Sequence, residues 1–193
     1  DLSATLYQGD SLNALTTLKP ESIDLIYVDP PFFTGKKFVS SKNANAQFKD
    51  SWGNDLGAYT DYLVQRIRVA RQLLKPTGSL LLHLDHHAVH YLKVACDQVF
   101  GYQNFQYEII WAYNSGGGAR KRYGRKHDTI LWYSKGDQFT FNSEKARVPY
   151  DAVIAKKRQH LFHEKGKVSG DVLNISRPPN HSDEWSGWPT QKP

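Results

Sequence analysis

The 193-residue chain contains a single cysteine, Cys96, and no long run of apolar residues. One cysteine rules out an internal disulfide framework and a cysteine-rich zinc site. The longest apolar run, near Leu80–Leu82, is far shorter than the roughly 20 residues that a membrane-spanning helix needs. The N-terminal residues also lack a signal-peptide pattern. We therefore expect a cytoplasmic protein in a reducing compartment.

Methionine is absent as well. A translated chain begins with methionine, whereas this one begins at Asp1, so we expect it to be a piece of something longer. The rest of the composition, with 39% hydrophobic and 23% charged residues, is typical of a folded globular domain. It disfavours disorder, collagen and coiled coil. The length predicts one domain with a substantial core.

Positive charge is concentrated in one segment. Residues 116–167 contain 13 lysines and arginines against 5 acids, whereas residues 1–115 contain 10 against 11 and residues 168–193 contain 2 against 3. Such a basic block, with aromatic residues interspersed, favours a nucleic-acid partner over a merely solvated surface. The candidates for phosphate contacts within it are Arg120, Lys121, Arg122, Arg125 and Lys126.

Alternating strand and helix patterns predict an α/β fold. Continuous apolar runs predict buried strands at Ile23–Val28, Ser79–Leu84, Tyr107–Tyr113 and Asp128–Ser134. Apolar residues at helical spacing predict helices within residues 12–18, 59–74 and 88–99. Residues 33–54, rich in Gly, Ser, Asn and Lys, predict a long flexible loop. After Lys135 the periodicity is weak.

Three polar clusters follow predicted strands. Asp10 follows a short, partly apolar segment at 5–8 that we expect to be a first strand, the sequence Asp29-Pro30-Pro31-Phe32 follows the second, and residues 83–87 end the third. Ligands of open α/β sheets bind outside the carboxyl ends of the strands. The sequence therefore places its candidate chemistry on one edge of one sheet.

The tetrapeptide Asp29-Pro30-Pro31-Phe32 has a specific chemical logic. Two prolines stiffen the loop, and they leave carbonyl oxygens that can accept hydrogen bonds. A carboxylate and a proline carbonyl together suit an exocyclic amine, which offers two N–H donors. The aromatic ring of Phe32 could hold a planar base flipped out of a duplex. A strand-ending turn with a buried Phe is the alternative.

At these residues the chain resembles the S-adenosyl-methionine-dependent DNA amino-methyltransferases, in the permuted (beta) group whose catalytic motif comes first. The resemblance covers nearly the whole chain. The segments that carry it are Gly9-Asp10-Ser11-Leu12, Asp29-Pro30-Pro31-Phe32, Leu74-Lys75-Pro76-Thr77-Gly78-Ser79, Glu108-Ile109-Ile110-Trp111, Gly116-Gly117-Gly118, Lys126-His127-Asp128-Thr129-Ile130-Leu131 and Trp188-Pro189-Thr190-Gln191-Lys192-Pro193.

The resemblance implies a Rossmann-like methyltransferase sheet, S-adenosyl-methionine as cofactor and double-stranded DNA as partner. Asp29 and the carbonyl of Pro30, in a loop that Pro31 stiffens, would bind the target amine, and Phe32 would stack on the base. The amine would attack the sulfonium methyl directly, without a covalent enzyme intermediate. The implied cofactor-binding residues are Asp10, Pro189, Thr190, Gln191 and Lys192.

The target base is expected to be adenine, methylated at N6, because the family mostly has Asp at the first motif position for adenine and Ser for cytosine. A restriction-modification role is one setting for such an enzyme. Two alternatives remain open. One is methylation of another planar amine or amide, such as cytosine N4, and the other is a non-catalytic DNA-binding fragment of such an enzyme.

The resemblance also suggests a domain organisation. Residues 1–134 would be the catalytic portion, 135–187 the target-recognition region, and 188–193 the start of the cofactor-pocket segment. The family's glycine-rich cofactor loop should follow that segment and is not in the sequence. We therefore expect an N-terminal portion whose sheet lacks the C-terminal cofactor-binding strands. The missing half, covalent or split, would be a partner, and a homodimer is a further option.

Four histidines and an acid suggest a metal cluster. They are His83, Asp85, His86, His87 and His90. A metal site needs about three converging ligands and a supporting shell of hydrogen bonds. The resemblance makes this segment a loop at the sheet edge without a metal, so we expect none. Cys96 lies on an apolar helix face and is expected in the core.

Overall fold

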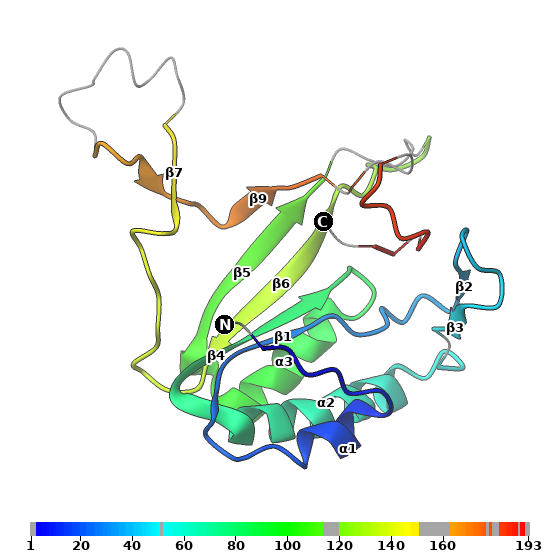
Figure 1. Cartoon of the computed structure of the whole chain (residues 1–193), viewed down its shortest axis with the longest axis horizontal. Helices are drawn as coiled ribbons and strands as arrows, with labels where there is room; N and C mark the ends of the chain where they lie inside the picture. The colour runs from blue at the N-terminus through cyan, green and yellow to red at the C-terminus, as the bar shows by residue number, and fades with distance from the viewer. Residues whose placement is uncertain are drawn as a thin grey trace.

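A five-stranded sheet forms the centre of the protein, with strand order β1–β4–β6–β5–β9 (Figure 1). The strands are β1 Ile23–Val28, β4 Leu74–Leu84, β5 Phe105–Ala112, β6 His127–Ser134 and β9 Val172–Asn174. β1 pairs in parallel with β4, β6 runs antiparallel between β4 and β5, and β9 pairs in parallel with β5. The computed structural model describes residues 3–50, 52–113, 120–150, 163–176, 178, 182–188 and 190–191. The predicted α/β class is confirmed.

Three helices lie on one side of this sheet (Figure 1). They are α1 Ser11–Leu15, α2 Leu56–Leu73 and α3 Val89–Phe100, and a short 3-10 helix, η1 Tyr102–Asn104, follows α3. α2 begins where the Asp55 carboxylate accepts a hydrogen bond from the Ala58 N–H at 2.8 Å. It connects the parallel strands β1 and β4, as parallel pairing requires.

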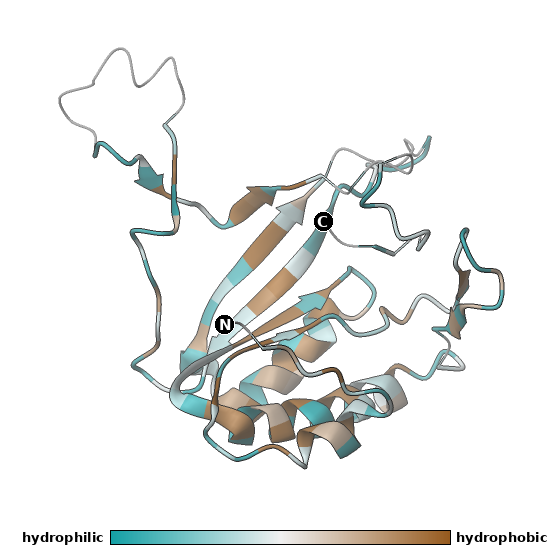
Figure 2. Cartoon of the chain, in the orientation of Figure 1, coloured by the Kyte–Doolittle hydropathy of each residue, from teal (hydrophilic) through white to brown (hydrophobic). Residues whose placement is uncertain are grey.

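The core lies between the helices and the central strands. Figure 2 shows hydrophobic residues along the sheet and over the helices. Apolar side chains of α2 and α3 meet those of β4 and β6. The buried members include Tyr59, Leu63, Ile67, Leu80, Leu82, Leu92, Cys96, Phe100, Leu131 and Tyr133. The helix face expected from the sequence is the buried one, and Cys96 is a core residue as predicted.

β4 also approaches β1 closely at its start. A Cβ added to Gly78 would lie 3.0 Å from the carbonyl oxygen of Ile23 and 3.1 Å from that of Asp24. Glycine therefore lets the two parallel strands come together here. This contact supports the carboxyl end of β1, where Asp29 follows.

Two local predictions were wrong. Residues 3–8 form no strand in the described part of the chain, and Leu6 there is 94% exposed, so no partner strand covers it. The expected loop at 33–54 contains a hairpin of β2 Lys37–Val39 and β3 Gln47–Lys49, held by Phe38 stacked on Phe48 with ring centroids 5.0 Å apart. Each strand has only three residues, too few for its alternation to be visible in the sequence.

The weakly periodic region after Lys135 contributes short strands. β7 Arg147–Val148 pairs with β8 Lys167–Val168, and β9 joins the edge of the main sheet. The expected division at residue 134 stays a prediction. Among the described residues, every helix is too short or too polar to cross a bilayer.

Candidate functional site

The Asp29-Pro30-Pro31-Phe32 corner follows β1 directly and forms part of a cavity of about 180 Å³. The cavity walls come from the corner, the β2–β3 hairpin and the C-terminal segment, and include Asp29, Pro30, Phe32, Phe38, Phe48 and Thr190. The side chain of Asp29 is 32% exposed. A carboxylate and three aromatic rings thus face a space that is accessible from solvent.

The corner is held from behind by α2. The hydroxyl of Tyr59, on α2, donates a hydrogen bond to the carbonyl oxygen of Pro31 at 2.6 Å. Tyr59 is itself fully buried and packs against Phe33 with ring centroids 5.2 Å apart. The second proline of the corner is therefore fixed to the core, and the corner cannot move independently of α2.

Asp50 fixes the residues that follow the corner. Its buried carboxylate accepts hydrogen bonds from the Phe33 N–H at 3.1 Å, the Thr34 N–H at 2.8 Å and the Thr34 hydroxyl at 2.6 Å. Phe33 has φ = 61°, a left-handed conformation that a non-glycine residue adopts only when its surroundings impose it. The strain lies one residue after Phe32, next to the cavity.

His83, near the end of β4, lies directly beside the corner. Its imidazole is buried, and its ring contacts Phe32 at a centroid distance of 5.5 Å and Trp111 of β5 at 5.1 Å. The nearest atoms of His83 and Asp29, Nδ1 and Oδ1, are 3.9 Å apart. The predicted strand-end clusters at residues 29–32 and 83–87 are therefore brought together at one edge of the sheet.

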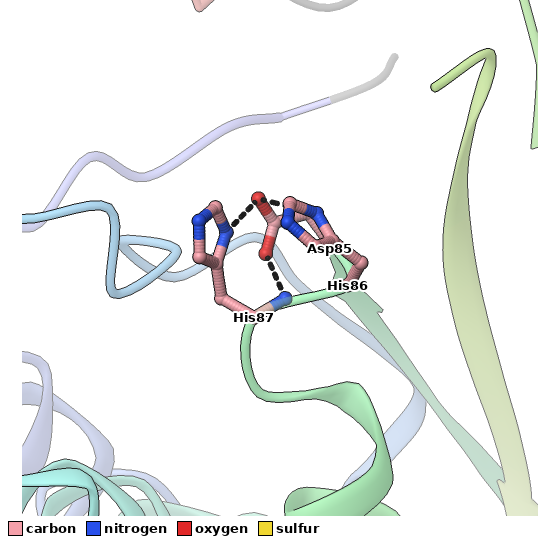
Figure 3. Close-up of side chains that lie close together, drawn as sticks. All are labelled: Asp85, His86 and His87. Atoms are coloured by element: carbon pink, nitrogen blue, oxygen red, sulfur yellow. Dashed lines mark hydrogen bonds and ion pairs between the residues drawn. The ribbon is translucent and has the colours of Figure 1, made fainter. Parts of the chain in front are cut away.

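The turn after β4 gathers the other histidines of the cluster. Asp85 accepts hydrogen bonds from the backbone N–H of His87 at 2.9 Å and from its Nδ1 at 2.6 Å, and His86 Nδ1 lies 3.7 Å from the same carboxylate (Figure 3). The ligand atoms of these three residues lie within 4.8 Å of one another, so they could hold a metal ion. His83 and His90 are outside this group of three.

The basic segment before β6 reaches the same edge. Because β6 runs antiparallel to β4, residues 120–126 precede β6 near the end of β4. Burial lowers the pKa of His86, His87 adds to this, and the charges of Arg125 and Arg122 lower it further against the opposing effect of Asp85. The candidate residues Arg120, Lys121, Arg122 and Arg125 are exposed, and Lys126 is partly exposed.

The predicted cofactor residues are distributed over two places. Thr190 lines the cavity beside Asp29, whereas Asp10 lies at the start of α1. There the Asp10 carboxylate accepts from the Leu12 N–H at 2.8 Å and binds Arg66 of α2 at 2.6 Å, and these contacts lower its pKa. Asp10 thus caps a helix instead of ending a strand.

Gln191 organises the C-terminal segment. Its side-chain oxygen accepts hydrogen bonds from the backbone N–H and the hydroxyl of Ser186, both at 2.7 Å, and its amide donates to the carbonyl of Glu184. Gly187 in the same segment accepts from Ser41, which joins the segment to the β2–β3 hairpin. Pro189 and Lys192 lie outside the described residues.

Sequence reasoning did not identify several residues that shape the site. They are Tyr27, Asp50, Tyr59 and Asp128. Tyr59 was placed on a buried helix face, which explains its burial but not its hydrogen bond to the corner. An acid such as Asp50, in a polar loop, gives no sequence signal of burial.

The sheet order, the covering helices and the strand-end site define a Rossmann-like methyltransferase fold. It is similar to the cytosine-N4-specific PvuII DNA methyltransferase, with a TM-score of 0.62 and 20% identity over 92% of this chain and 58% of that one. It is also similar to the DNA modification methylase TTHA0409 of Thermus thermophilus, with a TM-score of 0.54 and 19% identity over 88% of this chain and 66% of that one. That protein has also been solved in complex with S-adenosyl-L-methionine.

The chain belongs to the DNA methylase family, whose model matches residues 23–193. It is 30% identical to the DNA adenine methyltransferase YhdJ of Escherichia coli K12, over 98% of this chain and 63% of that protein. It is 31% identical to the type II methyltransferase M.KpnI of Klebsiella pneumoniae, over 91% of this chain and 43% of that protein. The chain thus spans about half the length of these two relatives.

Proposed function

We propose that this chain forms the catalytic part of a DNA methyltransferase that methylates the N6 amine of adenine. The observation that carries the proposal is the Asp29-Pro30-Pro31-Phe32 corner, placed at the carboxyl end of β1 on the wall of an accessible cavity. The catalytic residues would be Asp29, Pro30, Pro31 and Phe32. Membership of the DNA methylase family supports the reaction class.

The residues of the corner fit an amine on a planar ring. The Asp29 carboxylate and the Pro30 carbonyl would accept the two N–H groups of the amine, and Phe32 would hold the ring. Acceptors placed in this way draw the lone pair of the amine out of conjugation and aim it at an electrophile. Catalysis would then come mostly from positioning and from fixed acceptors, with no covalent enzyme intermediate.

S-adenosyl-methionine would supply an electrophilic methyl group on a cationic sulfonium. The cavity fits this end of the cofactor, because the carboxylate of Asp29 can face a cation and Thr190 also lines the cavity. At about 180 Å³ the cavity is below the roughly 300 Å³ typical of small-ligand sites, so the described residues form only part of the binding surface. Of the proposed cofactor residues, Thr190 and Gln191 are best placed for it, and Asp10 the least.

We also propose that further strands complete the sheet at β1. β1 lies at one end of the strand order, and its residues Leu25 and Tyr27 are 56% and 49% exposed. An uncovered strand edge with exposed apolar residues is suited to pairing with another segment. That segment would come from the rest of the natural polypeptide or from a separate chain, and would carry most of the cofactor site. A homodimer through this edge is the alternative arrangement.

Double-stranded DNA is the proposed partner. Arg120, Lys121, Arg122, Arg125 and Lys126 would contact phosphates beside the site, since they lie before β6 at the edge that carries Asp29. Adenine is preferred over cytosine because the first motif residue is Asp. Cytosine N4 is the second candidate, because the PvuII enzyme with a similar fold is cytosine-N4-specific.

The test is Asp29→Asn in the polypeptide encoded by the complete natural reading frame. We expect methyl transfer to fall at least 100-fold while DNA affinity changes less than twofold, since Asp29 would act on the amine and not on the DNA backbone. Mass spectrometry of the digested DNA distinguishes N6-methyladenine from N4-methylcytosine. Asp24→Asn, on the same strand but exposed and paired with Lys75, is the matched control. Unchanged turnover in Asp29→Asn would refute the assigned role.

A further inference from the structure

His83 lies at the centre of a buried polar network that the predicted catalytic motif does not include. Its side chain is 1% exposed. The hydroxyl of Tyr27, on β1, lies 2.5 Å from Nδ1, and a carboxylate oxygen of Asp128, on β6, lies 3.2 Å from Nε2. Asp128 also accepts a hydrogen bond from the hydroxyl of Tyr113 at 3.2 Å. Three neighbouring strands therefore meet at one imidazole.

The chemistry of the partners determines where the protons lie. A carboxylate only accepts, so Nε2 of His83 carries a proton and donates it to Asp128. Nδ1 is then an acceptor, and the Tyr27 hydroxyl donates to it. Burial raises the pKa of Tyr27 to about 12, and the charges of Asp29 and Asp128 contribute, so the hydroxyl keeps its proton at neutral pH. The imidazole thus has a defined tautomer and a defined orientation.

This oriented ring supports the two sides of the corner that would contact the base. Phe32 packs against it at a centroid distance of 5.5 Å with the planes tilted by 45°. Asp29 Oδ1 lies 3.9 Å from Nδ1, just beyond hydrogen-bond distance but close enough for a direct electrostatic interaction. Trp111 contacts the ring edge-on at 5.1 Å, and its indole N–H donates to the Ile175 carbonyl. A rotation of the imidazole would therefore displace Phe32 and Asp29 together.

A purely structural role would favour a different residue at this position. The neighbours of His83 along β4, Leu82 and Leu84, are buried and apolar, and a third leucine would fill the core without hydrogen-bonding requirements. A buried polar network costs stability unless every member is satisfied. Its location against the corner, and not elsewhere in the sheet, gives a reason to maintain that cost.

We propose that His83 is a positioning residue for methyl transfer: held by Tyr27 and Asp128, it sets the orientation of the Asp29 carboxylate and the Phe32 ring toward the target base. This role rests on the proposed function. Small displacements of reacting groups reduce rates by as much as about 100-fold, so loss of the orientation lowers kcat. Binding of DNA depends on the basic segment and is unaffected.

The experiment compares His83→Gln and Tyr27→Phe in the polypeptide from the complete natural reading frame. Glutamine places its amide near Nε2, so it can still donate to Asp128 but has no acceptor for Tyr27. We expect kcat to fall 10- to 100-fold in His83→Gln and 3- to 10-fold in Tyr27→Phe, with KM for DNA within twofold of wild type. Because both variants remove one interaction, the double variant should be no slower than His83→Gln.

Matched controls and a second measurement keep the outcomes distinct. His90→Gln and Tyr91→Phe, both exposed on α3, should retain full activity. Nitrogen NMR of the imidazole should show His83 protonated at Nε2 and not at Nδ1. Since Tyr27 is half exposed, Tyr27→Phe tests the proposal even where His83→Gln does not fold.

Normal kcat in Tyr27→Phe and in folded His83→Gln, or a proton on Nδ1, would overturn the positioning role while leaving the proposed function intact. A wild-type protein that binds DNA and cofactor but transfers no methyl group would overturn the proposed function, and the positioning role with it. Equal losses in kcat and in thermal stability across all four variants would indicate general destabilisation and would also overturn the role.

Discussion

Replacing Asp50 with alanine is expected to loosen the catalytic corner and to destabilise the whole protein. The carboxylate is 1% exposed and accepts three hydrogen bonds, from the Phe33 N–H, the Thr34 N–H and the Thr34 hydroxyl. Hydrogen bonds to a charged group contribute about 1.5–3 kcal/mol each. Phe33 and Thr34 are only partly buried, so water can replace part of each bond, and the lower figure applies. The three bonds together then contribute about 4–5 kcal/mol.

Relief of strain offsets part of this loss. Phe33 has a left-handed φ of 61° that Asp50 helps to maintain, and such a conformation costs about 1–2 kcal/mol. The net decrease in the free energy of unfolding should therefore be about 3 kcal/mol. With a urea m-value of about 2 kcal/mol/M, the unfolding midpoint should fall by about 1.5 M.

The assay is equilibrium urea unfolding followed by tryptophan fluorescence, with Asp61→Ala as the matched control. Asp61 is exposed on α2, so its removal should change the midpoint by less than about 0.3 M. A midpoint shift below about 0.5 M for Asp50→Ala would refute the assignment of three strong hydrogen bonds to this carboxylate. In the methyl-transfer assay, Asp50→Ala should also lose activity at urea-free conditions, because the residue after Phe32 is no longer fixed.

Two further predictions concern pH and salt. Burial raises the pKa of the Cys96 thiol to about 12, with the charge of Asp97 contributing, so the unfolded chain loses this proton first. Stability should therefore fall as pH rises from about 9 toward 12, and Cys96→Ala should show a smaller fall in urea midpoint between pH 8 and pH 10.5; an unchanged fall would contradict the burial argument. Replacing Arg122 and Arg125 by glutamine should weaken DNA binding and make its dependence on the logarithm of salt concentration shallower by about 1 per arginine. An unchanged salt slope in a binding titration would exclude phosphate contacts by these two residues.

The local sequence determined the main elements well where one face of an element is buried. Apolar spacing along α2 and the continuous runs of β1, β4, β5 and β6 follow directly from side-chain periodicity. The same pattern placed two of the polar clusters, at residues 29–32 and 83–87, at the ends of adjacent parallel strands. Their proximity follows from parallel pairing, which a run of consecutive strand, helix and strand requires.

Short elements and edges were not predictable in this way. The β2–β3 hairpin is held by Phe38 on Phe48, a contact between two residues of different strands within a polar segment. The segment at 3–8 has apolar residues but no strand beside it in the described structure, so composition alone gave the wrong result. Asp10 consequently caps α1 and pairs with Arg66, a contact across 56 positions.

The sequence by itself determined the chemistry that is available: an acid, two prolines and an aromatic residue after a buried strand, and a basic segment in the second half. Only the tertiary structure decided which groups hold that chemistry in place. Asp50, Tyr59 and His83 act on the corner from a distant loop, a helix and a neighbouring strand. Hydrogen bonds of this kind depend on the packing of segments far apart in the chain, and such packing has no periodic signature in the sequence.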